Sequence, residues 1–242
     1  MLQVCLNGAR TREECRSLPM SPGELAAAAA RAVAAGADDI HLHPKDGEGR
    51  DSLAPHVVAR AVTAVRRAVP PHIRTGVTTG AWAVPEPERR AALVRSWTVL
   101  PDHASVNWHE DGAEQVAEAL LDRGVGVEAG IYSGTDAARR FCASPFPGRV
   151  LRVLAEVTDG DAATAEETAL ALVAELDPAR PTPVLLHGED GSAWPVVRVA
   201  ARLGLDTRVG LEDVLVLPDG SAVPDNAALV QAARTLLATK GE

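Results

Sequence analysis

Cysteine is scarce in this sequence, and its three cysteines, Cys5, Cys15 and Cys142, lie far apart. An odd number without close spacing argues against a disulfide framework and against a zinc site built from cysteine. Aromatic residues make up only 3% of the chain, so few flat side chains can stack on nucleobases. A secreted disulfide scaffold and a nucleobase-stacking protein are therefore both disfavoured.

Long apolar runs and an excess of positive charge are also missing. No run of about 18 apolar residues occurs, and Met1 leads straight into a strand-like pattern instead of a charged segment followed by an apolar one. The 33 acidic residues outnumber the 24 basic ones, and a net charge of −9 repels a phosphate backbone. We expect a cytoplasmic protein without a membrane or nucleic-acid partner.

The chain has 242 residues, 46% of them hydrophobic, which is enough for one sizeable core, so we expect a single domain over residues 1–242. Strand-like segments alternate with helical ones eight times. The strands are expected at 2–6, 38–43, 72–78, 103–108, 125–128, 149–157, 183–187 and 207–211. The helices that follow them are expected at 21–36, 54–69, 85–99, 112–123, 136–143, 164–176, 193–203 and 225–239.

Strict alternation of this kind asks for a parallel sheet covered by helices, and eight units is the number that closes a barrel. The alternative, a doubly wound open sheet, usually carries a glycine-rich turn after its first strand, and the segment 7–10 has no G-x-G-x-x-G pattern. The sequence therefore predicts an α/β fold of the (β/α)8 TIM-barrel type.

Helix caps support several of these boundaries. Ser21 followed by Pro22 and Glu24 has the pattern of a capping box, and Thr164 with Glu167 has the same spacing. Asp225 is placed to cap the final helix.

A His-x-His pair lies in the second expected strand. Ile40 and Leu42 alternate with His41 and His43, and the period of two on a strand sends both imidazoles to one side. Two histidines on rigid backbone suit a divalent ion such as zinc. The alternative is a pair of hydrogen-bonded polar residues at the mouth of a strand.

Polar residues also gather where the other strands end. In a TIM barrel these ends and the loops after them build the active site. Each residue taken alone could be an ordinary solvated side chain. The set comprises Glu13, Glu14, His41, His43, Thr78, Thr79, Ser105, Asn107, His109, Glu128, Glu156, His187, Glu189, Arg208, Glu212 and Asp213.

The last strand offers a third metal ligand. Alternation puts Arg208 and Glu212 on the lumen side with Gly210 between them, where a missing side chain leaves room for a ligand or a metal. Two histidines and one carboxylate leave coordination positions open, as in a catalytic zinc site. The alternative is an ion pair between Arg208 and Glu212 across the barrel mouth.

Several segments along the chain resemble the β-keto acid cleavage enzymes. They are Leu42–Arg50, Gly76–Gly80, Ala104–Asn107, His187–Glu189, Arg208–Asp213 and Leu217–Gly220. The resemblance implies a zinc-dependent TIM barrel that converts a β-keto acid and acetyl-CoA into acetoacetate and a new CoA ester, and a homo-oligomer. The chain departs from typical members in its shorter length, in Lys45 and Thr78 where arginine and serine are common, and around Glu128.

The resemblance also implies roles for individual residues. His41, His43 and Glu212 would hold the metal. Arg208, Asp213 and Glu14 would carry the acid, base and charge-stabilising work. The substrate would be bound by Thr78, Ser105, Asn107 and Glu128, the first two at its carboxylate.

Carbon–carbon cleavage beside a ketone needs a place for developing enolate charge, which a zinc ion supplies as a Lewis acid. A second reading is a zinc-dependent hydrolase on the same barrel, and only the first reading requires acetyl-CoA. A third is a barrel that binds metal or ligand without catalysis.

Overall fold

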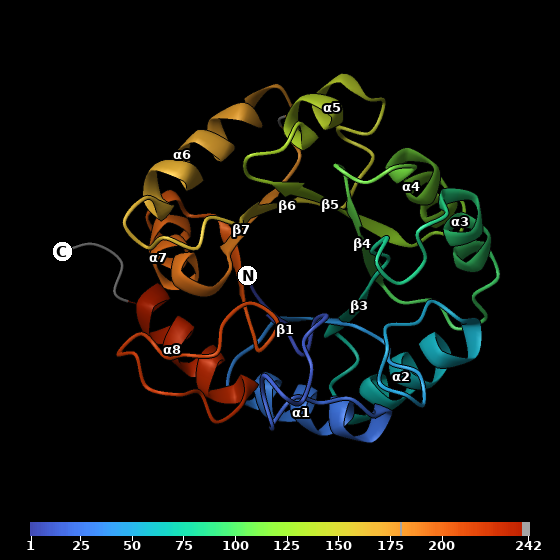
Figure 1. The fold of residues 1–242 in the computed structure, drawn as a ribbon, viewed down its shortest axis with the longest axis horizontal. Coiled ribbons are helices and arrows are strands. Elements are labelled where there is room, and N and C mark those ends of the chain that lie inside the picture. Colours follow the sequence, from blue (N-terminus) through green and yellow to red (C-terminus); the bar gives the residue numbers. More distant parts are fainter. Residues whose placement is uncertain (180, 239–242) are drawn as a thin grey trace.

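The computed structural model describes residues 1–179 and 181–238. Within these residues, eight parallel strands pair in sequence order and the last pairs with the first, which closes the barrel and confirms the predicted TIM-barrel fold (Figure 1). The strands are β1 (Leu2–Cys5), β2 (Asp39–Leu42), β3 (Arg74–Thr78), β4 (His103–Asn107), β5 (Gly126–Tyr132), β6 (Arg152–Val157), β7 (Val184–Gly188) and β8 (Asp206–Val209).

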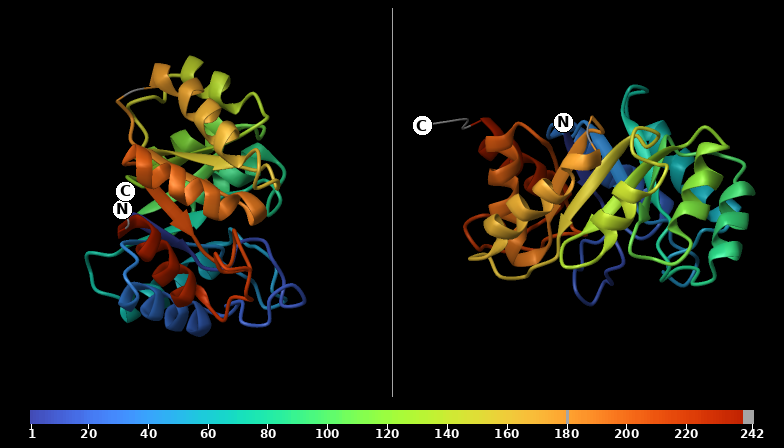
Figure 2. Two further views of the ribbon diagram at one scale, coloured as in Figure 1. Left: turned by 90° about the vertical axis from the view of Figure 1, so that its left-hand side faces the viewer. Right: turned by 90° about the horizontal axis from the view of Figure 1, so that it is seen from above.

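Helices form a ring around the strands (Figures 1 and 2). They are α1 (Pro22–Ala34), α2 (Pro55–Ala68), α3 (Pro87–Arg95), α4 (Ala113–Leu121), α5 (Ala137–Ala143), α6 (Ala165–Glu175), α7 (Ala193–Leu203) and α8 (Asn226–Ala238), with short 3-10 turns at Asp177–Ala179 and Asp190–Ser192. No helix in the described part of the chain has the length and apolar character needed to cross a membrane.

The predicted helix caps are confirmed at two of three places. Ser21 caps α1, and Glu24 accepts a hydrogen bond from the Ser21 N–H at 2.9 Å, which completes a capping box. Asp225 accepts from the first turn of α8, whose predicted end near residue 239 lies outside the described residues. The capping box at Thr164 is wrong, because its hydroxyl donates to Asp159 in the preceding loop.

The eighth strand is shorter than the sequence predicts. It ends at Val209, and Glu212 and Asp213 lie in the turn that follows. The prediction that Gly210 leaves room for a ligand or a metal is wrong, because the space is filled by β1: a Cβ atom there would lie 1.8 Å from the Cys5 carbonyl oxygen. The missing side chain instead lets the turn pack directly on the backbone of β1. This packing brings the carboxylates of Glu212 and Asp213 to the mouth of the barrel.

Alternation along the strands divides the barrel into an apolar outside and a polar inside. In β4, Ala104 and Val106 belong to the buried apolar core between strands and helices. His103, Ser105 and Asn107 share the opposite face, and His103 contacts polar side chains of other strands there. The lumen is therefore lined by polar groups.

The floor of the lumen is a buried network of charges. Arg152 donates to Asp39 and to Glu128, both at 2.8 Å. His103 lies between the same carboxylates, 2.9 Å from Asp39 and 3.1 Å from Glu128. Burial alone lowers the pKa of His103, but the two carboxylates raise it to about 10, so the ring is charged at neutral pH. Two cations thus balance two anions beneath the mouth.

Replacing Arg152 by Met should destabilise the protein strongly, because two buried carboxylates lose a cation. Breaking such a pair commonly costs about 3–5 kcal/mol, which in a chain of this size lowers the melting temperature by roughly 6–20 °C. The control is Arg149→Met, whose pair with Glu118 is 44% exposed on both sides. Thermal unfolding of both variants tests this, and equal melting temperatures would count against a structural role for the floor.

Candidate metal centre and active site

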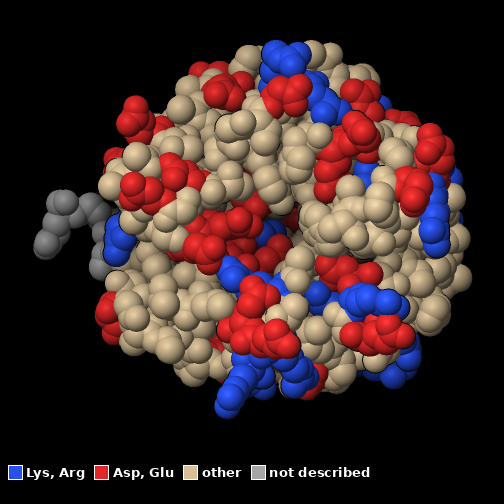
Figure 3. Space-filling model, viewed as in Figure 1, with Lys and Arg blue, Asp and Glu red and all other residues tan. Residues whose placement is uncertain are grey.

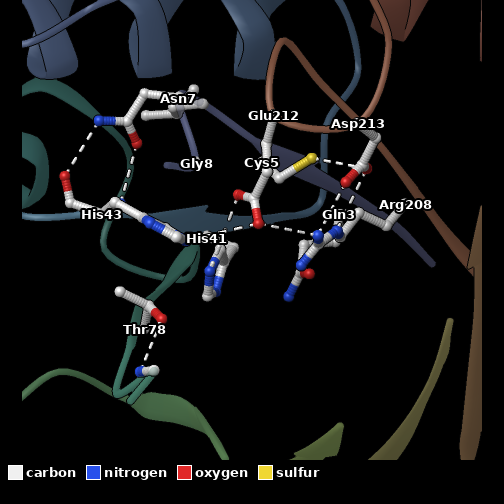
Figure 4. A network of polar contacts seen from close by, with 12 residues as sticks. Gln3, Cys5, Asn7, Gly8, His41, His43, Thr78, Arg208, Glu212 and Asp213 are labelled. Carbon is white, nitrogen blue, oxygen red and sulfur yellow. Dashed lines mark hydrogen bonds and ion pairs between the residues drawn. The ribbon is translucent and has the colours of Figure 1, made fainter. Parts of the chain in front are cut away.

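Three side chains meet at the mouth of the barrel in an arrangement that can hold a metal ion. His41 and His43 come from β2 and its end, and Glu212 comes from the turn after β8 (Figure 4). One ligand atom from each lies within 4.8 Å of the others. The Glu212 carboxylate is 3.4 Å from His43 Nε2 and 3.9 Å from His41 Nε2.

These spacings fit a tetrahedral divalent ion. Bonds of about 2.0–2.2 Å place tetrahedral ligand atoms roughly 3.3–3.6 Å apart. The separation of His43 Nε2 from Glu212 Oε1, 3.4 Å, lies in this range, and that of His41 Nε2 from Glu212 Oε2, 3.9 Å, is slightly longer. Within the described residues, Glu212 Oε2 is buried without a hydrogen-bond partner. A buried carboxylate oxygen without a partner is costly, and a cation would satisfy it. The donor set therefore fits a metal.

Two groups hold His43 in position. Its backbone N–H donates to Asn7 Oδ1 at 2.9 Å, and the Asn7 amide donates back to the His43 carbonyl at 3.0 Å. Asp51 lies 3.1 Å from Nδ1, on the side of the ring away from Glu212. A carboxylate on the second nitrogen fixes the orientation of a metal-binding histidine. Asp51 is held in turn by Lys45 at 2.6 Å.

The two histidines differ in their electrostatic surroundings. Burial lowers the pKa of His41 to about 4. Burial acts on His43 in the same direction, but Glu212 and Asp51 more than offset it and raise its pKa to about 9. His41 is therefore neutral at pH 7 and ready to coordinate, whereas metal binding at His43 displaces a proton.

The turn after β8 is fixed from the β1 side. Arg10 donates to the Glu212 carbonyl at 2.9 Å and to Asp190 at 2.7 Å. Gly8 has a φ of +60°, and a Cβ atom there would lie 2.4 Å from the Glu212 side chain. The absence of a side chain at Gly8 therefore makes room for the Glu212 side chain, and Arg10 of the same loop fixes the Glu212 backbone by a hydrogen bond.

Arg208 connects the three candidate metal ligands, His41, His43 and Glu212, to a second carboxylate. We call these three side chains the metal cluster. Its guanidinium donates to Glu212 at 3.0 Å and to both oxygens of Asp213, at 2.8 and 3.2 Å (Figure 4). Cys5 Sγ donates to Asp213 at 2.8 Å. Burial raises the pKa of Glu212, but Arg208 and His43 more than offset this and hold the pKa well below its usual range. Glu212 is thus an anion ready for a cation.

Thr78, Ser105 and Asn107 stand on neighbouring strands, as predicted. Val77 pairs with Leu42, which places Thr78 level with His43, and Thr78 pairs with Ser105 in turn. The Thr78 hydroxyl accepts from the Gly80 N–H at 3.1 Å, so its own hydrogen remains available to an anion. The Asn107 amide donates to Glu110 at 2.9 Å.

Two predicted site residues lie at the margins of this site, one below it and one at its rim. Glu128 is fully buried in the floor network, with its second oxygen 3.9 Å from His41 Nδ1, so its position does not suit substrate binding. It lies behind a metal ligand instead. Glu14 is 47% exposed at the outer rim and accepts from Thr11, which lowers its pKa. Glu14 nevertheless lines the cavity that covers His43 and Glu212, so its role in acid or base catalysis stays a prediction.

A cavity of about 380 Å3 covers the metal cluster, and Figure 3 shows acidic side chains around the central hollow. Tyr132 and Glu189 line it together with His43 and Glu212. Glu189 shares a hydrogen bond with Glu156, and burial raises the pKa values of Glu156 and Glu189 to about 7 and about 9. This pair therefore keeps a proton near neutral pH.

Four functional positions were missed by sequence reasoning. Asp51, Arg10 and Trp82 come from loops, where no periodicity marks a side chain as inward-facing. Trp82 stacks on His43 with ring centroids 5.7 Å apart and donates to Asp51 at 2.7 Å. Cys5 had a usable signal, because it alternates with Gln3 on the lumen face of β1.

Several solved structures share this fold. A ternary complex of ObcA with a C4-CoA adduct and oxalate superposes with a TM-score of 0.70 at 19% identity, covering 93% of this chain and 64% of that one. This chain therefore spans less than two thirds of that protein. A type I 3-dehydroquinate dehydratase from Clostridium difficile gives 0.65 at 12% identity, covering 99% and 93%. The carboxyl transferase domain of Rhizobium etli pyruvate carboxylase gives 0.61 at 14%, covering 98% and 47%.

A search of curated proteins finds no match. At these identities the solved structures establish the fold alone. The family described as beta-keto acid cleavage enzyme matches residues 1–242. The match therefore includes every residue of the site: the histidine pair, Arg208 and the Glu212–Asp213 turn. The chain belongs to the beta-keto acid cleavage enzyme family.

Proposed function

We propose that this protein is a zinc-dependent enzyme that converts a β-keto acid and acetyl-CoA into acetoacetate and a new CoA ester. The observation that carries the proposal is that Arg208 connects the candidate metal site to a second carboxylate, Asp213. Its guanidinium contacts both the metal-ligand carboxylate of Glu212 and the adjacent carboxylate of Asp213, all in one buried cluster. Family membership supports the substrate class.

The donor set favours zinc. Two imidazole nitrogens and one carboxylate suit a borderline-soft ion and leave a position for substrate. When bound, zinc supplies a Lewis acid that polarises the ketone and lowers the energy of enolate charge beside it. His41, His43 and Glu212 would hold the ion, while Asp51 and the floor carboxylate of Glu128 lie behind the two rings.

Short hydroxyl side chains bind the substrate carboxylate. Thr78 and Ser105 are 2% and 7% exposed on adjacent strands at the level of His43. Hydroxyl groups donate to a carboxylate without adding a positive charge that competes with the metal. Asn107, tied to Glu110, supports the same wall. The keto acid then places its carboxylate at β3 and β4 and its ketone towards the metal ligands.

The remaining chemistry moves protons and stabilises charge. The stoichiometry transfers a CH2–COO− unit from one acyl group to another, so a proton leaves this carbon before the new bond forms and returns after the old bond breaks. The new carbon–carbon bond forms at the acetyl carbonyl and expels CoA as its thiolate. The thiolate attacks the original acyl carbonyl, which breaks the old carbon–carbon bond and gives the new CoA ester. Asp213 takes and returns that proton at its carboxylate. Arg208 orients Asp213 through both oxygens and places fixed positive charge where oxyanion charge develops.

Acetyl-CoA is the co-substrate. The structural neighbour ObcA was solved with a C4-CoA adduct and oxalate, a pairing of CoA chemistry and a small carboxylate on the same fold. A hydrolase on this barrel would need no CoA at all. Incubation of the zinc-loaded protein with a panel of β-keto acids should give acetoacetate and a CoA ester only when acetyl-CoA is present. Cleavage of the panel without acetyl-CoA would establish the hydrolase instead.

Asp51→Asn should weaken zinc binding by about 10–100-fold, because the amide no longer holds His43 as a carboxylate does. The control is Asp46→Asn in the same loop, where the carboxylate pairs with the exposed Arg50 and does not contact His43. Competition with a chromogenic chelator gives both affinities. Equal affinities in the two variants would remove Asp51 from the support of the site.

Substitutions of Arg208 and Asp213 should affect turnover, whereas substitution of Glu212 should affect metal binding. Glu212→Ala removes a ligand and should lose the metal. Arg208→Ala and Asp213→Asn should keep zinc yet lose about 10²–10³-fold in turnover, because preorganised charge acts mainly in the transition state. Arg208→Lys should restore little, since an ammonium does not reproduce the bidentate contact.

Metal content, melting temperature and acetoacetate formation are measured on the same preparations. Near-normal turnover in Arg208→Ala and Asp213→Asn, or metal loss equal to that of Glu212→Ala, would contradict the division of roles.

A further inference from the structure

A second and larger cavity lies beside the metal cavity. Its volume is about 680 Å3, within the range of small-molecule sites, and it shares Ala9, Arg10 and Trp82 with the wall of the metal cavity. It is formed by the loops after β1, β2 and β3 and by one side of α3. None of the residues assigned above to the keto acid lines it. The two cavities are therefore neighbours with different walls.

The larger cavity is basic, against the charge of the chain as a whole. Its charged lining consists of Arg10, Lys45, Arg50, Arg89, Asp46 and Asp51. Four cations minus two anions leave an excess of two positive charges, whereas the chain has a net charge of −9. Such a local reversal of sign attracts an anionic ligand.

Arg89 differs from the other three cations of this cavity, which all form ion pairs. The two carboxylates in the cavity are already paired, Asp51 with Lys45 at 2.6 Å and Asp46 with Arg50 at 3.2 Å. Arg89 is exposed on α3 and makes no ion pair or hydrogen bond with the described residues 1–179 and 181–238. A guanidinium in that state is available to a phosphate group, which it binds through parallel N–H donors.

Trp82 forms the boundary between the cavities. It is 48% exposed, whereas Trp97, Trp108 and Trp194 are at most 6% exposed. The indole is held by its hydrogen bond to Asp51, by stacking on His43 and by Gly80, where a Cβ atom would lie 2.2 Å from the ring. A flat aromatic side chain that is both exposed and fixed in orientation suits contact with a ligand.

We infer that this cavity binds the phosphorylated adenosine and pantetheine arm of the CoA thioester, with the acyl end passing Trp82 to the metal cluster. The inference rests on the proposed function. The keto acid has one carboxylate and fits the hydroxyl groups of β3 and β4. The CoA thioester carries phosphates, a purine and a long flexible arm, and its reactive end must reach the same metal cluster.

The variant that tests the site is Arg89→Glu. It should weaken CoA binding to the zinc-loaded protein about tenfold or more, since hydrogen bonds to charged groups are among the stronger ones. The KM for acetyl-CoA should rise by a similar factor, while the KM for the keto acid stays unchanged. Isothermal titration with CoA measures binding without turnover.

The matched control is Arg60→Glu. Arg60 is exposed in the middle of α2, makes no ion pair with the described residues and does not line the cavity. Both variants change the net charge equally, so a difference in CoA binding between them does not come from net charge. Arg60→Glu should bind CoA as the unaltered protein does, and melting temperatures verify that both variants fold.

Fluorescence gives an independent readout. CoA and adenosine 3′,5′-bisphosphate should both quench the emission of the exposed Trp82, and Trp82→Phe should abolish the change. Should Arg89→Glu bind CoA as tightly as the unaltered protein, or no more weakly than Arg60→Glu, the site lies elsewhere while the proposed function stands. Should the unaltered protein neither bind CoA nor form acetoacetate, both the inference and the proposed function are overturned.

Discussion

The guanidinium of Arg208 binds two buried carboxylates, Glu212 and Asp213, next to two histidines, and the site depends on this arrangement. Glu212 and Asp213 follow each other in one turn, and without a cation between them their charges would repel at close range in a dry environment. A buried pair of this kind contributes little net stability, but removing one partner is costly. The pairing of Arg208 with Glu212 and Asp213 therefore serves chiefly to fix the geometry and charge of the proposed active site.

Beneath this cluster, the floor of the lumen also pairs buried carboxylates with buried cations, using different residues. Arg152 and His103 neutralise Asp39 and Glu128, and Glu128 also approaches the back of His41. The candidate metal ligands therefore lie above a layer in which each carboxylate is already paired with a cation. The mouth above has anions with fewer partners, which is where an added cation and a substrate would find free interactions.

Periodicity made the barrel and the histidine pair predictable from the sequence. Eight strand and helix alternations determine closure, and the period of two places His41 and His43 on one face without knowledge of the rest of the chain. Glu212 was chosen correctly as a neighbour of these histidines, but for a wrong local reason, because it lies in a turn and not on a strand. Asp51, Arg10 and Trp82 could not be predicted, since their loops carry no period and their partners are distant in sequence.

The contact between Gly210 and the Cys5 carbonyl also bears on how this site can vary during evolution. Any side chain at position 210 would push the turn away from β1 and displace Glu212 and Asp213 together. A related chain could keep every polar residue of the cluster and still fail to assemble it if position 210 were not glycine. This residue, which performs no chemistry, is thus a sharper criterion for an intact site than several of the residues that do.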